Sequence, residues 1–309
     1  SGKRVVGKFY RPGRWSDEQI LEEHRFLTEL DAAELPVATV RPFPDGTTLK
    51  QVDGIYYSLS DRRGGRAPDE LDAPLARRLG MLVGRLHNVG AASEAPSRRP
   101  LDAEHFVRRP LAWLEENYDF PAALERRYFD TAETIGDLAD RLMAEVDIHR
   151  IHADLHLGNV LLRDREFNLL DFDDMAPGPA VQDLWLALPG RDEETERLRG
   201  IFLEGYEQFR RFDRASLRLI EPLRGLRLVR YAVWLARRWD DPAFRQGWPH
   251  FGTSEYWENE TRDLEEQLAL IRRDSARSGV DIGLPVADLE VEVEEPLTNK
   301  DYFWDWEED

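Results

Sequence analysis

The side chains best suited to chemistry crowd into one stretch of the sequence, residues 152–174. Two short apolar runs enclose four polar residues, 163–166, and this pattern predicts a β-hairpin. Asp154 and Asn159 then lie on the loop that enters the first strand, and Asp171 ends the second strand. A tight hairpin would bring these three oxygen-bearing side chains around one point.

This group of oxygens predicts a magnesium site. Mg²⁺ is usually bound by only one or two protein carboxylates, with phosphate and water at the remaining positions, so a nucleotide phosphate is the natural missing partner. A zinc site at His152 and His156 is a poorer interpretation, because that spacing needs a helix, Gly158 favours a loop and the chain has no cysteine. The other alternative is a metal-free surface hairpin with an acidic end.

The same stretch resembles a known family. Residues 152–159, His-Ala-Asp-Leu-His-Leu-Gly-Asn, and the later Leu170-Asp171-Phe172-Asp173 are similar to the catalytic loop and metal-binding strand of the aminoglycoside phosphotransferase and choline kinase superfamily, relatives of the protein kinases. The similarity is closer to the bacterial stress response kinase A family and extends over residues 3–271. The further segments that carry it are Lys8–Pro12 with Trp15, Gln19–His24, Gly178–Trp185 and Ile220–Arg224.

The resemblance implies roles for the three oxygen-bearing residues. Asp154 would accept the proton of the attacking hydroxyl, while Asn159 and Asp171 would hold Mg²⁺ on the phosphates of ATP, so that Asp171 also counts as catalytic. These roles fit phosphoryl transfer, which depends on positioning the nucleophile and neutralising charge on the phosphoryl oxygens. His152 would orient the loop rather than titrate.

The motif departs from the family pattern at two positions. Ala153 stands where a glycine is usual between the His and the Asp, and Asp173 stands where protein kinases have the glycine of Asp-Phe-Gly. The first change adds a single methyl group, and the second is common among the small-molecule relatives. The predicted chemistry is therefore kept.

An early lysine is the next candidate. Residues 3–10 predict a strand in which polar Lys8 is embedded among apolar neighbours, and a helix follows to residue 30. Glu23 lies on the apolar face of that helix, whereas Glu22 points about 100° further round. Kinases use such a glutamate to aim the strand lysine at the α- and β-phosphates. Glu23 is thus predicted to position Lys8; the alternatives are an exposed lysine and an ordinary surface glutamate.

Three further strands are predicted, at 35–37, 48–51 and 55–60, and Asp53-Gly54 between the last two is a hairpin signal. By resemblance, the last strand ends in the hinge whose backbone receives the adenine. The residues expected to bind the nucleotide there are Tyr57, Leu59 and Ser60.

A phosphate-covering loop is the main missing element. Related kinases have two strands and such a loop before the lysine strand, and neither a Gly-x-Gly-x-x-Gly nor a P-loop pattern occurs in this chain. We expect that part of the protein to precede Ser1; the alternative is a protein that lacks the loop.

The predicted fold is α+β and bilobal, like that of protein kinases. A small β-rich N-lobe, residues 1–60, lacks its first strands here, a mainly helical C-lobe covers 61–273, and an acidic aromatic tail covers 274–309. Residues 93–110 are expected to be irregular, and Pro177 to Pro179 to interrupt the chain. Helices are expected at 72–87, 110–117, 121–128, 130–146, 181–188, 193–212, 214–239 and 254–273.

Three features of the C-lobe have two interpretations. Asp183 is either a charge favoured by a helix N-terminus or, by resemblance, a hydrogen-bond partner of the catalytic-loop backbone. His87 is interpreted as a packed structural histidine. Aromatic and arginine side chains within 214–239 form either core or a groove for the acceptor substrate, and core is the commoner outcome for such a stripe.

Composition limits the possible partners. A net charge of −19 argues against nucleic-acid binding, which needs a basic surface. No apolar run is long enough for a membrane helix and no signal-peptide pattern is present, so we expect a cytoplasmic protein that does not bind membranes. Residues 288–309 hold ten acids against Lys300, and their aromatic residues suggest docking on this chain or on a partner.

The expected activity is transfer of the γ-phosphate of ATP to a hydroxyl with Mg²⁺. By resemblance to the stress response kinases, the acceptor is a protein Ser or Thr. One alternative is a small-molecule phosphotransferase acting on an amino alcohol, a sugar or an aminoglycoside hydroxyl, because the same catalytic loop serves that chemistry. A second is a catalytically silent kinase-like binding protein.

Overall fold

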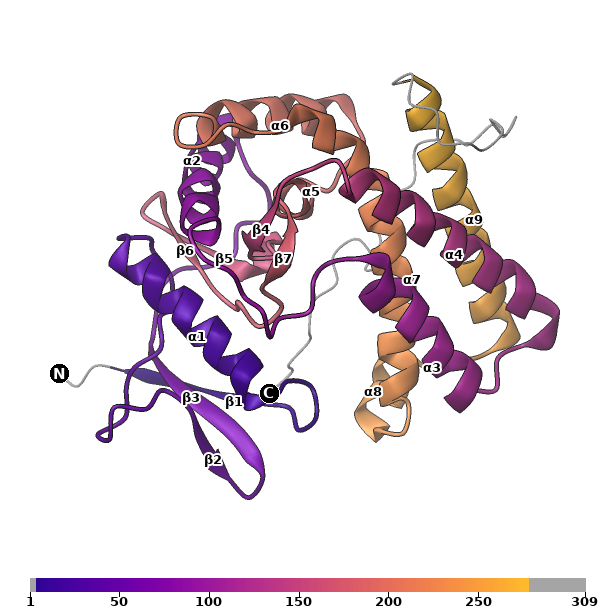
Figure 1. Ribbon diagram of the computed structural model, residues 1–309, viewed down its shortest axis with the longest axis horizontal. Coiled ribbons are helices and arrows are strands. Elements are labelled where there is room, and N and C mark those ends of the chain that lie inside the picture. Colours follow the sequence, from indigo (N-terminus) through magenta and orange to yellow (C-terminus); the bar gives the residue numbers. More distant parts are fainter. Residues whose placement is uncertain (1–3, 278–309) are drawn as a thin grey trace. The chain divides into compact units, whose positions relative to one another are not determined.

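The computed structural model describes residues 4–277 (Figure 1). The chain forms two compact units, each made of two separate segments. One unit comprises Ser1–Pro100 and Ile148–Phe212, and the other comprises Leu101–Asp147 and Asp213–Asp309. The predicted lobe boundaries at residues 60 and 273 stay a prediction, and the part of the acidic tail beyond residue 277 lies outside the described residues.

The first unit begins with a three-stranded antiparallel sheet and one helix. Strands β1 (Val5–Tyr10), β2 (Lys50–Val52) and β3 (Ile55–Asp61) lie in the order β1-β3-β2, and Lys8 is opposite Ser58. Helix α1 (Asp17–Ala32) starts at Ser16 with a capping box, in which Ser16 and Gln19 satisfy each other's backbone N–H groups. The helix, the lysine strand and the hairpin at Asp53-Gly54 are confirmed.

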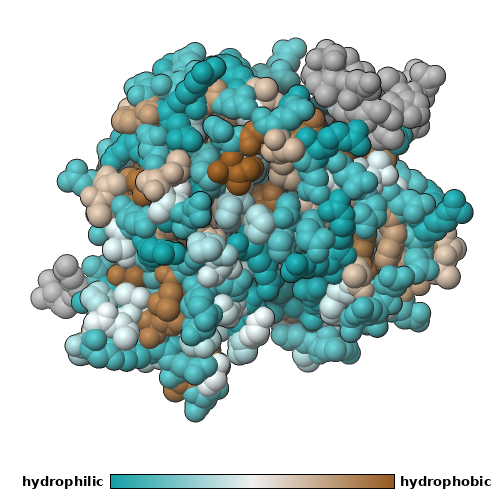
Figure 2. All heavy atoms as spheres, in the orientation of Figure 1, coloured by the Kyte–Doolittle hydropathy of each residue, from teal (hydrophilic) through white to brown (hydrophobic). Residues whose placement is uncertain are grey.

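One predicted strand does not form. Residues 35–37 make a single isolated bridge, between Val37 and Leu169. Hydrophobic side chains gather over the β1-β3-β2 sheet in Figure 2, and four apolar residues of β1 and β2 are exposed there. These residues are Val5, Val6, Phe9 and Val52.

The remaining strands hold the catalytic segment. Strand β4 (Ile148–Ile151) pairs with β7 (Ala176–Pro179), and β5 (Val160–Arg163) pairs with β6 (Glu166–Leu169). Helix α5 (Val181–Ala187) follows β7. The predicted interruption at the two prolines is wrong, because both lie in β7, which pairs only with β4 among the described strands and therefore has a free edge.

Two long helices of this unit pack at their backbones. Helix α2 (Ala73–Gly90) runs beside α6 (Glu193–Tyr206) (Figure 1). A Cβ at Gly80 would overlap the carbonyl of Phe202, and one at Gly205 would overlap the carbonyl of Arg77. Glycine is therefore required on both helices for their close approach.

The replacement Gly80→Ala is expected to destabilise the protein by about 3 kcal/mol, the upper end of overpacking costs, because backbone cannot rotate away as a side chain can. The matched control is Gly200→Ala on α6, whose new Cβ would meet no atom within 4 Å. That change should stabilise by up to about 1 kcal/mol through helix propensity. Urea unfolding of both variants checks this, and equal midpoints would disprove the packing argument.

The second unit is helical in the residues described. It contains η1 (Glu104–Arg108), α3 (Arg109–Asn117), α4 (Ala122–Met143), η3 (Arg214–Leu219), α7 (Ile220–Arg238), α8 (Pro242–Gly247) and α9 (Ser254–Arg277). Two expectations were wrong: one continuous helix, α4 (Ala122–Met143), replaces the two expected at 121–128 and 130–146, and the end of the supposedly irregular 93–110 is already helical. Within residues 4–277, no helix has the length and apolarity needed to cross a membrane.

Aromatic packing supplies the core of the second unit. Trp257, fully buried on α9, contacts the rings of Tyr118, Phe120 and Tyr128 at centroid separations of 4.4 to 5.6 Å. On α7, Tyr231 is buried as well. The burial of Tyr231 favours the core interpretation of the aromatic stripe at that residue.

Candidate active site

The hairpin forms as predicted and brings the loop to the second strand. Val160 pairs with Leu169, and the turn residues Asp164 and Arg165 both have positive φ, at 52° and 64°, as a tight hairpin turn requires. The backbone N–H of Leu170 donates to the carbonyl of Asn159 at 2.9 Å. The peptide before Asp171 is therefore fixed to the residue predicted to share its metal.

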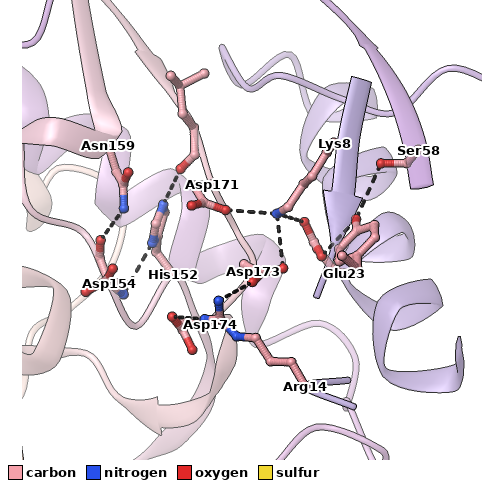
Figure 3. A network of polar contacts seen from close by, with 12 residues as sticks. Lys8, Arg14, Glu23, Ser58, His152, Asp154, Asn159, Asp171, Asp173 and Asp174 are labelled. Atoms are coloured by element: carbon pink, nitrogen blue, oxygen red, sulfur yellow. Dashed lines mark hydrogen bonds and ion pairs between the residues drawn. The ribbon is translucent and has the colours of Figure 1, made fainter. Parts of the chain in front are cut away.

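The catalytic loop is closed by side chains that bind its backbone (Figure 3). Asn159 Nδ2 donates to the carbonyl of Asp154 at 2.9 Å. His152 is fully buried; its Nε2 lies 2.7 Å from the carbonyl of Leu170, and its Nδ1 accepts from the N–H of Asp154 at 3.3 Å. Through these two contacts the ring ties the start of the loop to the residue before Asp171, which fits a role in orienting the loop.

Asp183 holds the start of the loop. Its two carboxylate oxygens accept from the N–H groups of His152 and Ala153 at 2.9 and 2.8 Å. Of its two interpretations, the hydrogen-bond partner of the loop is confirmed. Ala153 has φ of 68°, a left-handed conformation that favours glycine, which explains the family's usual residue at this position. The fully buried Asp183 holds the alanine in that conformation.

A second histidine, His87, contacts Asp183. His87 Nε2 lies 2.9 Å from Asp183 Oδ2, and His87 Nδ1 lies 3.0 Å from the hydroxyl of Tyr206. The carboxylate can only accept, so Nε2 donates and Nδ1 accepts from the tyrosine. His87 is the packed histidine that was expected, and it also fixes the residue that holds the loop.

Beside it lies His149, whose ring meets that of His87 edge-on at 4.9 Å. Within residues 4–277, neither of its ring nitrogens has a hydrogen-bond partner. Burial, with the neighbouring His87 and Arg210, lowers the pKa of His149 to about 2. The unfolded chain takes up this proton near the ordinary pKa of about 6.5. Because the unfolded state then binds more protons, stability falls as the pH drops below about 6.5.

The replacement His149→Leu removes the proton-binding group and is expected to flatten this acid dependence. From about pH 7 to about pH 4, the variant should lose roughly 3 kcal/mol less stability than the original chain, since each pKa unit corresponds to about 1.4 kcal/mol. Urea unfolding of both proteins at the two pH values measures the difference. Parallel losses would contradict the assignment.

Lys8 is the centre of charge in the site (Figure 3). Its Nζ lies 3.1 Å from Glu23 Oε1, 2.8 Å from Asp171 Oδ1 and 3.1 Å from Asp173 Oδ1. Burial alone would lower the pKa of Lys8, but these three carboxylates outweigh it and raise the pKa well above its usual range. The predicted pairing of Glu23 with Lys8 is confirmed, and the lysine stays charged at neutral pH.

Glu23 is itself fixed by its second oxygen. The hydroxyl of Tyr10 lies 3.3 Å from Glu23 Oε2 and 3.0 Å from His24 Nε2. Burial raises the pKa of Glu23 against the opposing pull of Lys8. Glu22 is buried too, but it accepts from the N–H groups of Ser97 and Arg98 at 3.0 to 3.1 Å, so it has a different partner from Glu23.

The donor set fits a hard cation bound together with phosphate. In the described part of the chain, no three His, Cys, Asp or Glu side chains cluster so that they could hold a metal alone. Mg²⁺ needs only one or two protein carboxylates when phosphate completes its shell. Asn159 has its amide nitrogen on Asp154, which leaves its oxygen for a cation, and the side chain of Asp171 is 45% exposed.

The three hinge residues lie in β3 and do not share one face. Ser60 is opposite Val6 and Lys8 is opposite Ser58, so Ser60 lies on the same face of the sheet as Lys8. Tyr57 and Leu59 point to the other face, where Tyr57 stacks on Phe9 at 5.8 Å. The carbonyl of Leu59 already accepts from the N–H of Arg41 at 2.7 Å. Their contact with adenine stays a prediction.

Asp173 and Arg14 were not assigned to the site from the sequence. Asp173 was noted only as a departure, yet it is buried and pairs with both Lys8 and Arg14, each at 3.1 Å. Arg14 also pairs with Asp174 at 2.9 Å. Burial opposes the ionisation of Asp173, but the two cations lower its pKa. The run of acids after Phe172 was the available signal.

Known proteins resemble this chain in sequence and in fold. The sequence model of the phosphotransferase enzyme family matches residues 1–220. Stress response kinase A of Escherichia coli (strain K12) is 36% identical over 271 residues, covering 87% of this chain and 82% of the relative. Serine/threonine protein kinase RdoA of Salmonella typhimurium (strain LT2) is 35% identical over 270 residues, with coverage of 87% and 82%.

Solved structures agree on the fold. A complex of amicoumacin kinase hAmiN with AMP-PNP, Ca²⁺ and Ami has a TM-score of 0.67 at 20% identity, covering 89% of this chain and 83% of that one. At that identity the likeness concerns the fold. The predicted α+β, kinase-like fold is confirmed.

Proposed function

The chain belongs to the phosphotransferase enzyme family and, within it, to the stress response kinase A family, and from this premise we propose that it transfers the γ-phosphate of ATP to a hydroxyl with the help of Mg²⁺. The observation that carries the proposal is the position of Lys8 between Glu23 and Asp171. A cation there can receive phosphate oxygens, and Asp171 can receive the metal.

The residues divide the chemistry among them. Asp154 accepts the proton of the attacking hydroxyl, whose oxygen forms a bond to the γ-phosphorus as the bond to the β-phosphate oxygen breaks and ADP leaves. Lys8 binds the phosphates, and Asn159 and Asp171 hold the metal. Bound Mg²⁺ neutralises charge on the transferring phosphoryl group.

For the acceptor we propose a serine or threonine hydroxyl of a protein. The support is the name of the Salmonella relative, a serine/threonine protein kinase. The proposed setting is a stress response, after the names of the stress response kinase A relatives.

The test has a binding step and a transfer step. Calorimetric titration of ATP with and without Mg²⁺ should give binding that depends on the metal. Incubation with γ-labelled ATP and a mixed protein substrate should then give phosphoserine or phosphothreonine on acid hydrolysis. Label found only on added amino alcohols, sugars or aminoglycosides would replace the protein acceptor, and no metal-dependent binding would reject the kinase proposal.

A further inference from the structure

Arg98 is a buried arginine outside the groups assigned so far. Its side chain is almost fully buried, at 3% exposure, and its guanidinium lies over the ring of Trp15 at 4.2 Å. Nε donates to the carbonyl of Met175 at 2.8 Å, and Nη1 donates to the carbonyl of Gln19 at 3.2 Å. Nη2 donates to the carbonyl of Asp173. The buried guanidinium thus binds three backbone carbonyls.

These contacts join two elements of the site. Gln19 lies in the first turn of α1, the helix that carries Glu23, and the carbonyls of Asp173 and Met175 lie in the turn that follows Asp171. The backbone N–H of Arg98 also donates to Glu22 of α1 at 3.0 Å. Arg98 therefore bridges the glutamate helix and the segment 171–175.

The segment needs such support. Asp171 has φ of 51°, a conformation that costs free energy for a residue other than glycine. Arg14 binds the side chains of Asp173 and Asp174 from one side, and its guanidinium lies 5.6 Å from the Trp15 ring that also meets Arg98 (Figure 3 shows Arg14). Arg98 binds the backbone of the same segment.

We propose that Arg98 is a positioning residue, which sets the affinity for Mg²⁺·ATP by holding the segment 171–175 against α1. The inference rests on the proposed function. Without its donors, the segment keeps its contacts with α1 through Lys8 and through the rings of Phe26 and Phe172, but it loses the hydrogen bonds that fix its backbone. Asp171 then meets the metal in a wider range of positions. Partners that hold a metal ligand in place typically contribute about 10- to 100-fold in metal affinity.

A second buried arginine provides a matched control. Arg150, at 1% exposure, donates to the carbonyls of Val89 and Gly90 at 3.0 and 3.2 Å and pairs with Glu29 of α1 at 2.5 Å. Like Arg98, it joins α1 to another element and binds backbone carbonyls, but these partners lie outside the segment 171–175. Its loss should lower stability without the same effect on the metal.

The experiment compares Arg98→Met, Arg98→Lys and Arg150→Met. The melting temperature should be lower in both methionine variants than in the unaltered chain. Calorimetric titration of Mg²⁺ into the protein with excess ATP should show affinity weakened by at least about 10-fold in Arg98→Met, partly regained in Arg98→Lys and nearly kept in Arg150→Met. If Arg98→Met does not fold, Arg98→Lys alone carries the test, and it should bind Mg²⁺ measurably more weakly than the unaltered chain does.

Three results would overturn the proposal. These are unchanged Mg²⁺ affinity in a folded Arg98 variant, an equal loss in Arg150→Met, and full affinity in Arg98→Lys when Arg98→Met is unfolded. Failure of the underlying function is distinguishable, because then the unaltered chain itself would bind no Mg²⁺·ATP.

Discussion

Asp154→Asn is expected to lower the turnover number by about 10²- to 10⁴-fold, the contribution typical of a positioned general base. The asparagine has the same shape but cannot take the proton of the attacking hydroxyl. The loop around it should survive, because Asn159 and His152 bind the backbone of residue 154 rather than its carboxylate. Affinity for Mg²⁺·ATP should therefore stay within about threefold, less than one kcal/mol. Steady-state phosphate transfer and calorimetry measure the two quantities.

Asp164→Asn is the matched control for this change. It removes an equal charge from the same hairpin, at a side chain that is 88% exposed, and asparagine tolerates the positive φ of 52° found there. Turnover should be unchanged. Comparable losses in the two variants, or full activity in Asp154→Asn, would refute the assigned role of Asp154.

Asp171→Asn is expected to abolish most of both binding and turnover. The metal contributes several kcal/mol to phosphoryl transfer, so losing about 4 kcal/mol lowers kcat/KM by about 10³-fold. Asparagine tolerates the left-handed backbone at this position, φ of 51°, which protects the fold. Calorimetry should now find little difference between ATP alone and ATP with Mg²⁺.

The two variants separate the two roles. Asp154→Asn should keep metal-dependent ATP binding, whereas Asp171→Asn should lose it. If Asp171→Asn still binds ATP more tightly with Mg²⁺ than without, to the same degree as the unaltered chain, then Asp171 is not the metal ligand. Circular dichroism on both proteins guards against misfolding as the cause.

Local patterns in the sequence were enough to predict the centre of the site. The hairpin around 163–166 and the helix bearing Glu23 follow from periodicity over a few residues, whereas the pairing of Lys8 with Glu23 was predicted from the arrangement that kinases use. The hairpin and the helix depend on residues that are neighbours in sequence. Their geometry was therefore accessible without a structure.

Strand β7 and Arg98, which hold the site in place, depend on contacts between residues distant in sequence. Such contacts leave no local pattern in the sequence. Strand β7 contains two prolines and pairs with β4, which is distant in sequence, so local propensity predicted an interruption. Arg98 lies in a segment expected to be irregular, and its partners are backbone carbonyls, which every residue has. Residue types therefore give no signal for this bridge.

The split construction of the first unit has a consequence for the order of events during synthesis. Its helix α2 packs on α6, and its lysine strand meets Asp171, so the unit needs chain from both sides of Leu101–Asp147. Contacts so distant in sequence must overcome the entropy of closing a long loop before they stabilise anything. During synthesis, the apolar surface of the first segment therefore stays exposed until residues 148–212 have been made. We expect chaperones to bind the chain most strongly in this interval.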